Sequence, residues 1–219
     1  MTPKNPMNPM NPMTHDVRLC RGAESEGGCP HGLDVAEGFG QRLDAVIRAT
    51  GWPEFLLERR PRPHRHHAFS VAVSACPNGC SRPHIADVGL IRACVPSLDP
   101  TFCTGCGECA ESCPDAAIDM ASGLPVIDAA ACLRCGHCVR ACPTGAMSRA
   151  EAGWRVLLGG RLGRRPALGT ELPGLHDDNA ALAVLERGLR LFMGRYGEFA
   201  RFGLLVDALG AGSLAGERP

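Results

Sequence analysis

Apolar residues follow a helical period across residues 33–49. They stand at Val35, Ala36, Phe39, Leu43, Val46 and Ile47. This spacing predicts an amphipathic helix, which Gly51 and Pro53 end. Residues 68–74 alternate between apolar and small polar side chains and predict a strand that runs into Cys76. Residues 85–95 have the pattern of a partly buried strand pair or of a strand and turn, and residues 154–158 that of a further strand.

The last third of the chain carries two further helical patterns. Asp177 or Asp178 can cap a helix. Its apolar positions are Ala181, Val184, Leu185, Leu189 and Phe192. A shorter helix is expected over residues 198–209 and ends at Gly210. Strands and helices in this order predict an α+β fold, in which helices cover one face of a sheet and strands lead into a site.

Composition excludes several classes of function. The chain has 219 residues, with 23 Lys and Arg against 23 Asp and Glu and a pI of 7.0, so no global field favours nucleic acid or an anionic membrane. One Tyr and two Trp leave little for stacking on bases. No apolar run is long enough to span a bilayer. The 13 cysteines follow no secretory segment, so a reducing cytoplasm is the expected compartment.

The first residues form a low-complexity repeat of Met, Asn and Pro that reaches Met13. Such a segment offers nothing to bury, so residues 1–16 are expected to be a disordered tail. A true start at Met13 is the alternative interpretation.

Eight of the cysteines belong to two copies of one pattern, Cys-x2-Cys-x2-Cys-x3-Cys-Pro, closed by Pro114 and Pro143. This is the spacing by which thiolates hold two 4Fe-4S clusters, with the fourth cysteine of each copy crossing to the other cluster. The predicted ligand sets are Cys103, Cys106, Cys109 and Cys142 for one cluster, and Cys132, Cys135, Cys138 and Cys113 for its neighbour. Structural zinc is the alternative, although it usually takes two cysteines from each of two knuckles.

A different pair, Cys76 and Cys80, encloses Pro-Asn-Gly at the end of the strand over residues 68–74. Such a pair could be buried, form a disulfide or clamp a metal. Two cysteines cannot hold a cubane cluster alone, and the partners available elsewhere are Cys20 and Cys29. Cys94 is left over and is expected to be a small buried residue.

Residues 74–91 closely resemble the cluster-binding segment of the sirohaem-dependent sulfite and nitrite reductases, and residues 157–163 and 201–203 are similar to that family as well. The resemblance covers about residues 17–210 and extends to the inserted ferredoxin segment. It implies an α+β sirohaem/4Fe-4S reductase half-domain over residues 17–99 and 150–219. A bacterial-type two-cluster ferredoxin module is then inserted at residues 100–149. The size suggests a small assimilatory-type sulfite reductase.

The same resemblance implies the cofactors. Cys20, Cys29, Cys76 and Cys80 match the family's cysteines that bind a third 4Fe-4S cluster, and Cys80 matches the one that bridges to the sirohaem iron. The spacing Cys20-x8-Cys29 departs from the family's usual Cys-x5-Cys. Candidates for binding the carboxylate rim of sirohaem are Arg82, Arg161, Arg164 and Arg165, with His84 close by. A solvated basic turn is the alternative for residues 161–165.

Candidate substrate and proton-donating residues are Arg18, Arg21, His31, Arg65 and His67, together with the bridging Cys80. For the run from His64 to His67, an exposed loop is the favoured interpretation. The implied reaction is the six-electron reduction of sulfite to sulfide. Two alternatives stay open: nitrite reduction, and a non-catalytic electron-transfer protein with several clusters and no sirohaem. The implied partners are a small anion, an electron-donor protein, and a second copy or another protein that completes the pocket, because little precedes Cys20.

Overall fold

The computed structural model describes residues 13–24 and 28–215. A five-stranded sheet forms the centre, in the order β1-β2-β3-β6-β7. Its strands are β1 (His15–Leu19), β2 (Phe69–Ser74), β3 (Val88–Leu98), β6 (Met147–Leu158) and β7 (Thr170–Glu171). β1, β2 and β3 run parallel, whereas β6 is antiparallel to β3 and to β7. Most of the expected tail lies outside the described residues, but its last two positions, His15 and Asp16, belong to β1.

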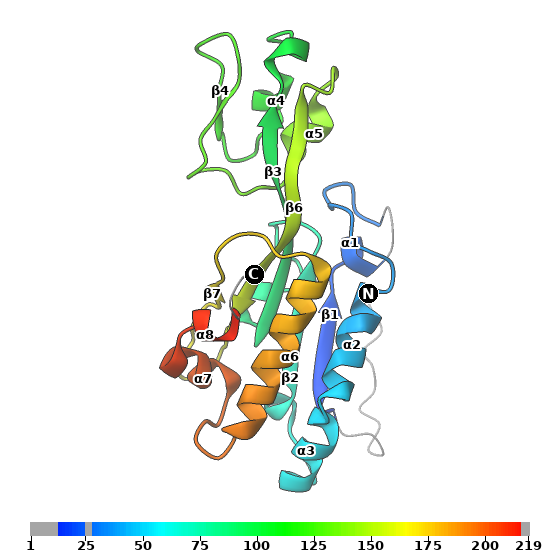
Figure 1. Ribbon diagram of the computed structural model, residues 1–219, viewed down its shortest axis with the longest axis vertical. Coiled ribbons are helices and arrows are strands. Elements are labelled where there is room, and N and C mark those ends of the chain that lie inside the picture. The colour runs from blue at the N-terminus through cyan, green and yellow to red at the C-terminus, as the bar shows by residue number, and fades with distance from the viewer. Residues whose placement is uncertain (1–12, 25–27, 216–219) are drawn as a thin grey trace.

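Helices pack against this sheet, with α6 lying along α2 (Figure 1). They are α1 (Arg21–Glu24), α2 (Phe39–Ala49), α3 (Trp52–Arg59), α6 (Asp178–Gly194), α7 (Phe202–Leu209) and α8 (Gly212–Ala215). The core between helices and sheet is apolar and aromatic, and the rings of Phe39 and Trp154 stack at 4.7 Å between centroids. The α+β class expected from the sequence is confirmed.

The helix expected over residues 33–49 begins only at Phe39. Gly38 has a φ of 72° and breaks the pattern before that residue. The helix α3 that follows was not expected. Gly51, with a φ of 77°, redirects the chain, and Pro53 lies in the first turn of α3, where its missing N–H leaves no hydrogen bond unmade. Gly51 and Pro53 therefore begin a second helix rather than only ending the first.

Other expected elements hold more closely. β2 and α6 lie where they were expected, with Asp177 as the N-cap of α6, and Gly210 ends α7, which starts at Phe202 rather than near residue 198. Two short 3₁₀ turns, Arg65–His67 and Pro83–Ile85, flank the strand β2 and its cysteine turn. Among the described residues, no helix is long and apolar enough to cross a membrane.

Residues 85–95 form no strand pair: Ile85 ends a 3₁₀ turn, and β3 then pairs with β6 up to Leu98 and Met147, with one register shift between Val95 and Pro96. The two strands extend beyond the sheet as a ribbon, and residues 99–146, here called the lobe, sit at its far end (Figure 1). The lobe contains a 3₁₀ turn (Pro100–Phe102), α4 (Glu108–Glu111), β4 (Ile118–Asp119), β5 (Val126–Ile127) and α5 (His137–Ala141). Its small core includes Cys109 and Cys138, against which Met147 of β6 packs. The remainder of the described chain is called the body.

Candidate cofactor and substrate site

Cys20 and Cys76 emerge at the same edge of the sheet, because β1 and β2 are parallel and Leu19, the last residue of β1, pairs with Val73 near the end of β2. The N–H of Cys20 bonds to Val73 O at 3.0 Å, and the N–H of Ala75 donates to Cys20 Sγ at 3.2 Å. A sheet edge thus fixes these two thiols beside each other.

Cys29 is packed against the same turn. A Cβ built at Gly22 would lie 3.0 Å from Cys29 Cβ and 3.1 Å from Ala75 Cβ, so a larger residue would have to push these neighbours apart. Cys80 closes the turn, and the side-chain amide of Asn78 donates to its Sγ at 3.1 Å. The structure therefore brings Cys20, Cys29, Cys76 and Cys80 together.

The pKa values of these thiols reflect their proximity. Burial raises the pKa of Cys76, and the neighbouring thiols of Cys20, Cys29 and Cys80 raise it further, against an N–H bond from Asn78. For Cys29 the N–H of His31 lowers the pKa, and Arg21 contributes in the same direction. Four gathered sulfurs with N–H groups directed at them are what a thiolate-held cluster needs, so these residues fit a 4Fe-4S cluster.

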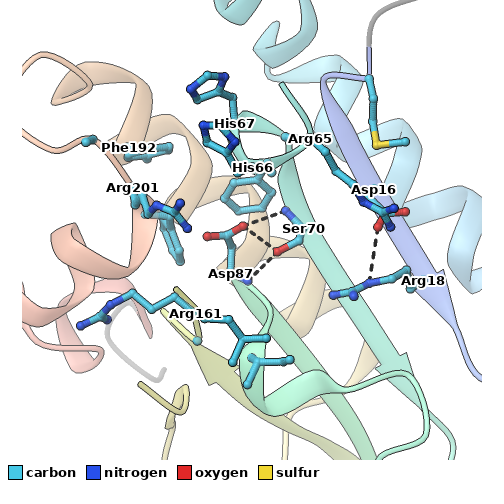
Figure 2. Close-up of a pocket in the computed structure, with 18 of the residues that line it drawn as sticks. Asp16, Arg18, Arg65, His66, His67, Ser70, Asp87, Arg161, Phe192 and Arg201 are labelled. Carbon is cyan, nitrogen blue, oxygen red and sulfur yellow. Dashed lines mark hydrogen bonds and ion pairs between the residues drawn. The ribbon is translucent and has the colours of Figure 1, made fainter. Parts of the chain in front are cut away.

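A cleft of about 230 Å³ is lined by residues of β1, of the start of β2 and of the segment that follows the Cys76–Cys80 turn, but by none of the four cysteines. Arg82, two residues after Cys80 and in the left-handed region with a φ of 63°, is part of its wall. The other arginines that line it are Arg18, Arg65, Arg161 and Arg201. Figure 2 shows four of them around Ser70 and Asp87. Five arginines on one concave surface make this a site for an anionic ligand.

Two arginine atoms in the cleft lack a hydrogen bond. Arg18 Nε and Arg161 Nε are buried and have no hydrogen-bond partner among the described residues. Arg18 Nε only approaches Asp16 Oδ2, at 3.5 Å, whereas the terminal nitrogens of Arg161 lie 2.6 and 3.3 Å from the Asp207 carboxylate. Buried cationic donors without partners are rare in folded proteins. The cleft therefore fits a polycarboxylate such as sirohaem, whose carboxylates can accept from them.

Asp87 is a half-buried acid of the cleft. Its Oδ2 accepts from the N–H of Ser70 at 2.8 Å and from the hydroxyl of Ser70 at 2.7 Å (Figure 2). Burial raises the pKa of Asp87, and the Ser70 hydrogen bonds only partly offset this. The carboxyl group thus retains a proton more readily than an exposed aspartate.

The histidine run takes part in the cleft. His66 and His67 line it, and His67 Nδ1 accepts from the N–H of His64 at 3.0 Å. Burial lowers the pKa of His67, and the neighbouring His66 and Arg60 lower it further. His64, Arg65 and His66 are exposed as expected, whereas His67 is half-buried.

The other predicted site residues are distributed as follows. Arg164 and Arg165 lie with Arg161 and Arg201 in an adjoining hollow. Arg21 interacts with the Cys29 thiol and lowers its pKa. His31 does not line the cleft but stacks on His137 of the lobe, with 5.3 Å between the ring centroids. No observation tests the individual roles, which stay predictions.

Some cleft residues were not expected from the sequence. Ser70, Asp87 and Arg201 line the cleft without a local motif that marks them. Arg201 could have been found from its place beside Phe202 and Gly203 in a family-like segment. The polar Asp87 directly before a long apolar strand was the other signal.

In the lobe, one small cavity is lined by Cys113, Cys132, Cys135 and Cys138 together. This matches one of the crossed ligand sets expected from the repeat. Burial raises the pKa of Cys138 to about 12, with further contributions from the thiols of Cys135 and Cys132.

The other predicted set shows similar chemistry. Burial raises the pKa of Cys109, and the thiols of Cys103 and Cys106 contribute in the same direction. N–H donation by Met147 and a bond to the Thr144 hydroxyl lower the pKa of Cys142 to about 7. Gathered thiols with N–H donors fit cluster ligands here as well.

The comparisons with known proteins agree with this geometry. The chain belongs to the family of the nitrite and sulphite reductase 4Fe-4S domain, whose profile matches residues 57–216. It is 36% identical over 183 residues to a coenzyme F420-dependent sulfite reductase of Methanocaldococcus jannaschii, which covers 83% of this chain and 27% of that protein. Over 62 residues it is 36% identical to one of the polypeptides of the anaerobic sulfite reductase of Salmonella typhimurium, covering 28% of this chain and 18% of the relative.

Two solved structures share the fold. Dissimilatory sulfite reductase I matches with a TM-score of 0.58 and 18% identity, over 93% of this chain and 52% of that one. The Mycobacterium tuberculosis NirA protein matches with a TM-score of 0.51 and 19% identity, over 90% and 26%. The chain thus spans only about a quarter of the first curated relative and half of the first structure. The recognition of the sirohaem reductase family from sequence motifs is confirmed.

Proposed function

We propose that this chain forms the cofactor-binding part of a sulfite reductase. The observation that carries the proposal is the cleft with five arginines, whose wall includes Arg82, two residues after Cys80, the last of the gathered thiols. The names of the relatives support sulfite as substrate. Sirohaem bound here would supply the redox chemistry at its iron, with Cys80 as the thiolate shared with the cluster.

The residues of the chain have three tasks in this reaction. Arg18, Arg82 and Arg161 present cationic donors to the carboxylates of the cofactor or to the anionic substrate. Reduction of sulfite to sulfide also consumes protons. Asp87, with its raised pKa, lies in the same cleft and can hold a proton for this purpose, and so can His67, although its lowered pKa makes it hold one less readily. The apolar rings of Phe69 and Phe202 in the wall exclude water from one side.

Electrons reach the cleft through the lobe in this proposal. Its eight thiols would hold two 4Fe-4S clusters, divided as the sequence repeat predicts, and the cavity that joins Cys113 to the second loop supports the crossing. Because the cleft is open to solvent on one side, a second copy or another protein would complete the pocket.

One experiment can distinguish sulfite reduction from the two alternative functions, nitrite reduction and electron transfer without sirohaem. Nitrite reduction uses the same family of sites, and a non-catalytic multi-cluster electron carrier would use the clusters without sirohaem. Protein purified without oxygen from cells that make sirohaem should show sirohaem absorption bands and should form sulfide from sulfite with a strong artificial reductant. Nitrite turnover without sulfide formation would favour the first alternative. Iron and sulfide without sirohaem would favour the second.

A further inference from the structure

The two cysteine loops of the lobe repeat one backbone conformation. Cys132 follows Cys103 by 29 residues, and the same offset relates the residues with positive φ. These are Gly105, Gly107 and Ala116 in the first copy, and Arg134, Gly136 and Gly145 in the second. The helices α4 and α5 start at equivalent places, directly after Gly107 and Gly136. Any difference between the loops therefore comes from their side chains and from what surrounds them, not from the backbone.

The second loop is covered by the body. A Cβ at Gly136 would lie 2.9 Å from both Cys94 Sγ and Leu33 Cδ2. The N–H of Cys94 donates to Arg134 O at 2.9 Å. His137, next in the chain, stacks on His31, which is two residues from Cys29. The second loop thus faces the gathered thiols of the body.

The first loop faces solvent. A Cβ at Gly107 would meet nothing within 4 Å, and Thr104, Gly105 and Cys106 are exposed. The turn between β4 and β5 adjoins this loop, because the carbonyl oxygen of Gly123 lies 3.0 Å from the Cβ position of Gly105. Three large apolar side chains of this half of the lobe are exposed: Phe102 at 61%, Leu124 at 39% and Val126 at 57%.

This half of the lobe is also strongly acidic. Residues 99–128 contain six acidic residues and no Lys, Arg or His, so all 23 Lys and Arg of the chain lie elsewhere. The acids are Asp99, Glu108, Glu111, Asp115, Asp119 and Asp128. A local negative field around exposed apolar side chains favours a partner of opposite charge.

We propose that the first loop and the surface of residues 99–128 dock a redox protein whose contact face is basic around an apolar centre. Electrons enter the lobe here and leave through the second loop towards Cys29 and Cys76. The proposal rests on the proposed function in one respect, that the lobe carries clusters. Charges bring the partner to the surface quickly, and the apolar side chains remove water from the contact.

The test uses oxidised cytochrome c, a basic haem protein, as the probe. Each ferric haem accepts one electron from a reduced cluster, and stopped-flow absorbance gives the second-order rate constant without sulfite. In the double variant Glu108→Lys/Glu111→Lys this constant should fall by about tenfold or more at low salt and approach that of the unmodified protein at high salt.

The matched control reverses two acids elsewhere. Glu54→Lys/Glu58→Lys changes the net charge equally on α3, at the end of the molecule far from the lobe (Figure 1). An equal fall in this control, or no fall in the lobe variant, would overturn the proposal. Self-association that only the lobe variant loses would assign the surface to a second copy and overturn it as well. A protein that reduces cytochrome c normally but forms no sulfide would overturn only the proposed function.

Discussion

Gly136 lies against Cys94 where the lobe meets the body, so closely that a methyl group at Gly136 would stand 2.9 Å from the sulfur. Cys94 is fully buried on β3, which confirms its expected role as a small packing residue. The contact joins a predicted cluster loop to a rigid strand. It therefore fixes the position of the second loop relative to the body.

This contact predicts an asymmetry between two equivalent glycines. Gly136→Ala and Gly107→Ala both place a side chain at positive φ, which costs each about 1 kcal/mol. Only the methyl group at Gly136 also meets Cys94 and Leu33. We expect a larger loss of thermal stability for Gly136→Ala, and faster amide exchange at Cys94, whose N–H bonds to Arg134 O. Equal losses in the two variants would show that the contact does not hold the lobe.

A second pair of variants should distinguish a predicted cluster ligand of the body from a cysteine that only packs. Cys80→Ser touches no ligand predicted for the lobe, so both lobe clusters should remain while the third cluster and its magnetic coupling to sirohaem are lost. Cys94→Ala removes a buried sulfur and should cost on the order of 1 kcal/mol of stability with all clusters retained. EPR spectra and iron content of both proteins decide this. Loss of the third cluster in Cys94→Ala alone would refute the ligand set.

Local sequence patterns predicted the helices and strands in which apolar residues recur regularly on the side that packs against the core. α6 keeps its apolar period through Leu189 and Phe192, and β2 is a buried strand along nearly its whole length. β1 escaped prediction because its five residues include His15, Asp16 and Arg18, so that only pairing with β2 makes it a strand. A short strand at the edge of a sheet has too few apolar residues in alternation to be predicted from its sequence.

The candidate site also has a part that the sequence predicts, the cysteines, and a part that only the fold reveals, the cleft. The cysteines could be predicted as cluster ligands from their spacing in the sequence, without knowledge of the fold. The cleft is formed by residues that are far apart in the sequence. Arg18 of β1 and Arg201, the N-cap of α7, line it together only because the sheet and helices bring them there. His31 was expected among the proton-donating residues because histidine titrates near neutral pH, but the loop turns it towards His137 of the lobe instead. Spacing along the chain does not give side-chain direction.

Arg161 offers a direct test of cofactor binding. Its guanidinium pairs with Asp207 and lines the cleft, whereas Arg155 makes a similar pair with Glu171, at 2.8 and 2.6 Å, outside it. Arg161→Ala should weaken sirohaem binding by about tenfold or more, because a charged hydrogen bond contributes about 1.5–3 kcal/mol. Arg155→Ala should cost only about 1 kcal/mol of stability. The sirohaem content of the two purified proteins, from absorption spectra, distinguishes these outcomes.

Cys106→Ala should interrupt electron supply without emptying the cleft. Cys106 is an exposed predicted ligand of the first loop. Its loss should remove one cluster, leave sirohaem bound, and slow sulfite reduction by a protein donor. A strong artificial reductant that reaches the cleft directly should restore much of the rate. If both reductants lose activity equally, the lobe does more than conduct electrons.

Asp87 makes a pH-dependent contribution to stability. Because burial raises its pKa in the folded protein, the folded state keeps a proton that the unfolded chain releases at lower pH. The free energy of unfolding therefore falls as the pH rises from the ordinary pKa of an aspartate to the raised one, by about 1.4 kcal/mol for each unit between them. Asp87→Asn has no proton to lose and keeps an oxygen that can accept from the Ser70 N–H, so this fall should disappear.

Urea unfolding of both proteins across the acidic to neutral range measures the difference. Glu58→Gln is the control, because the Glu58 side chain is 76% exposed and should leave the pH dependence of the unmodified protein unchanged. An Asp87→Asn protein that loses stability with rising pH as steeply as the unmodified one would show that Asp87 is ionised in the fold. In that case it could not serve the cleft as a proton store, and His67 would be the remaining candidate of the two.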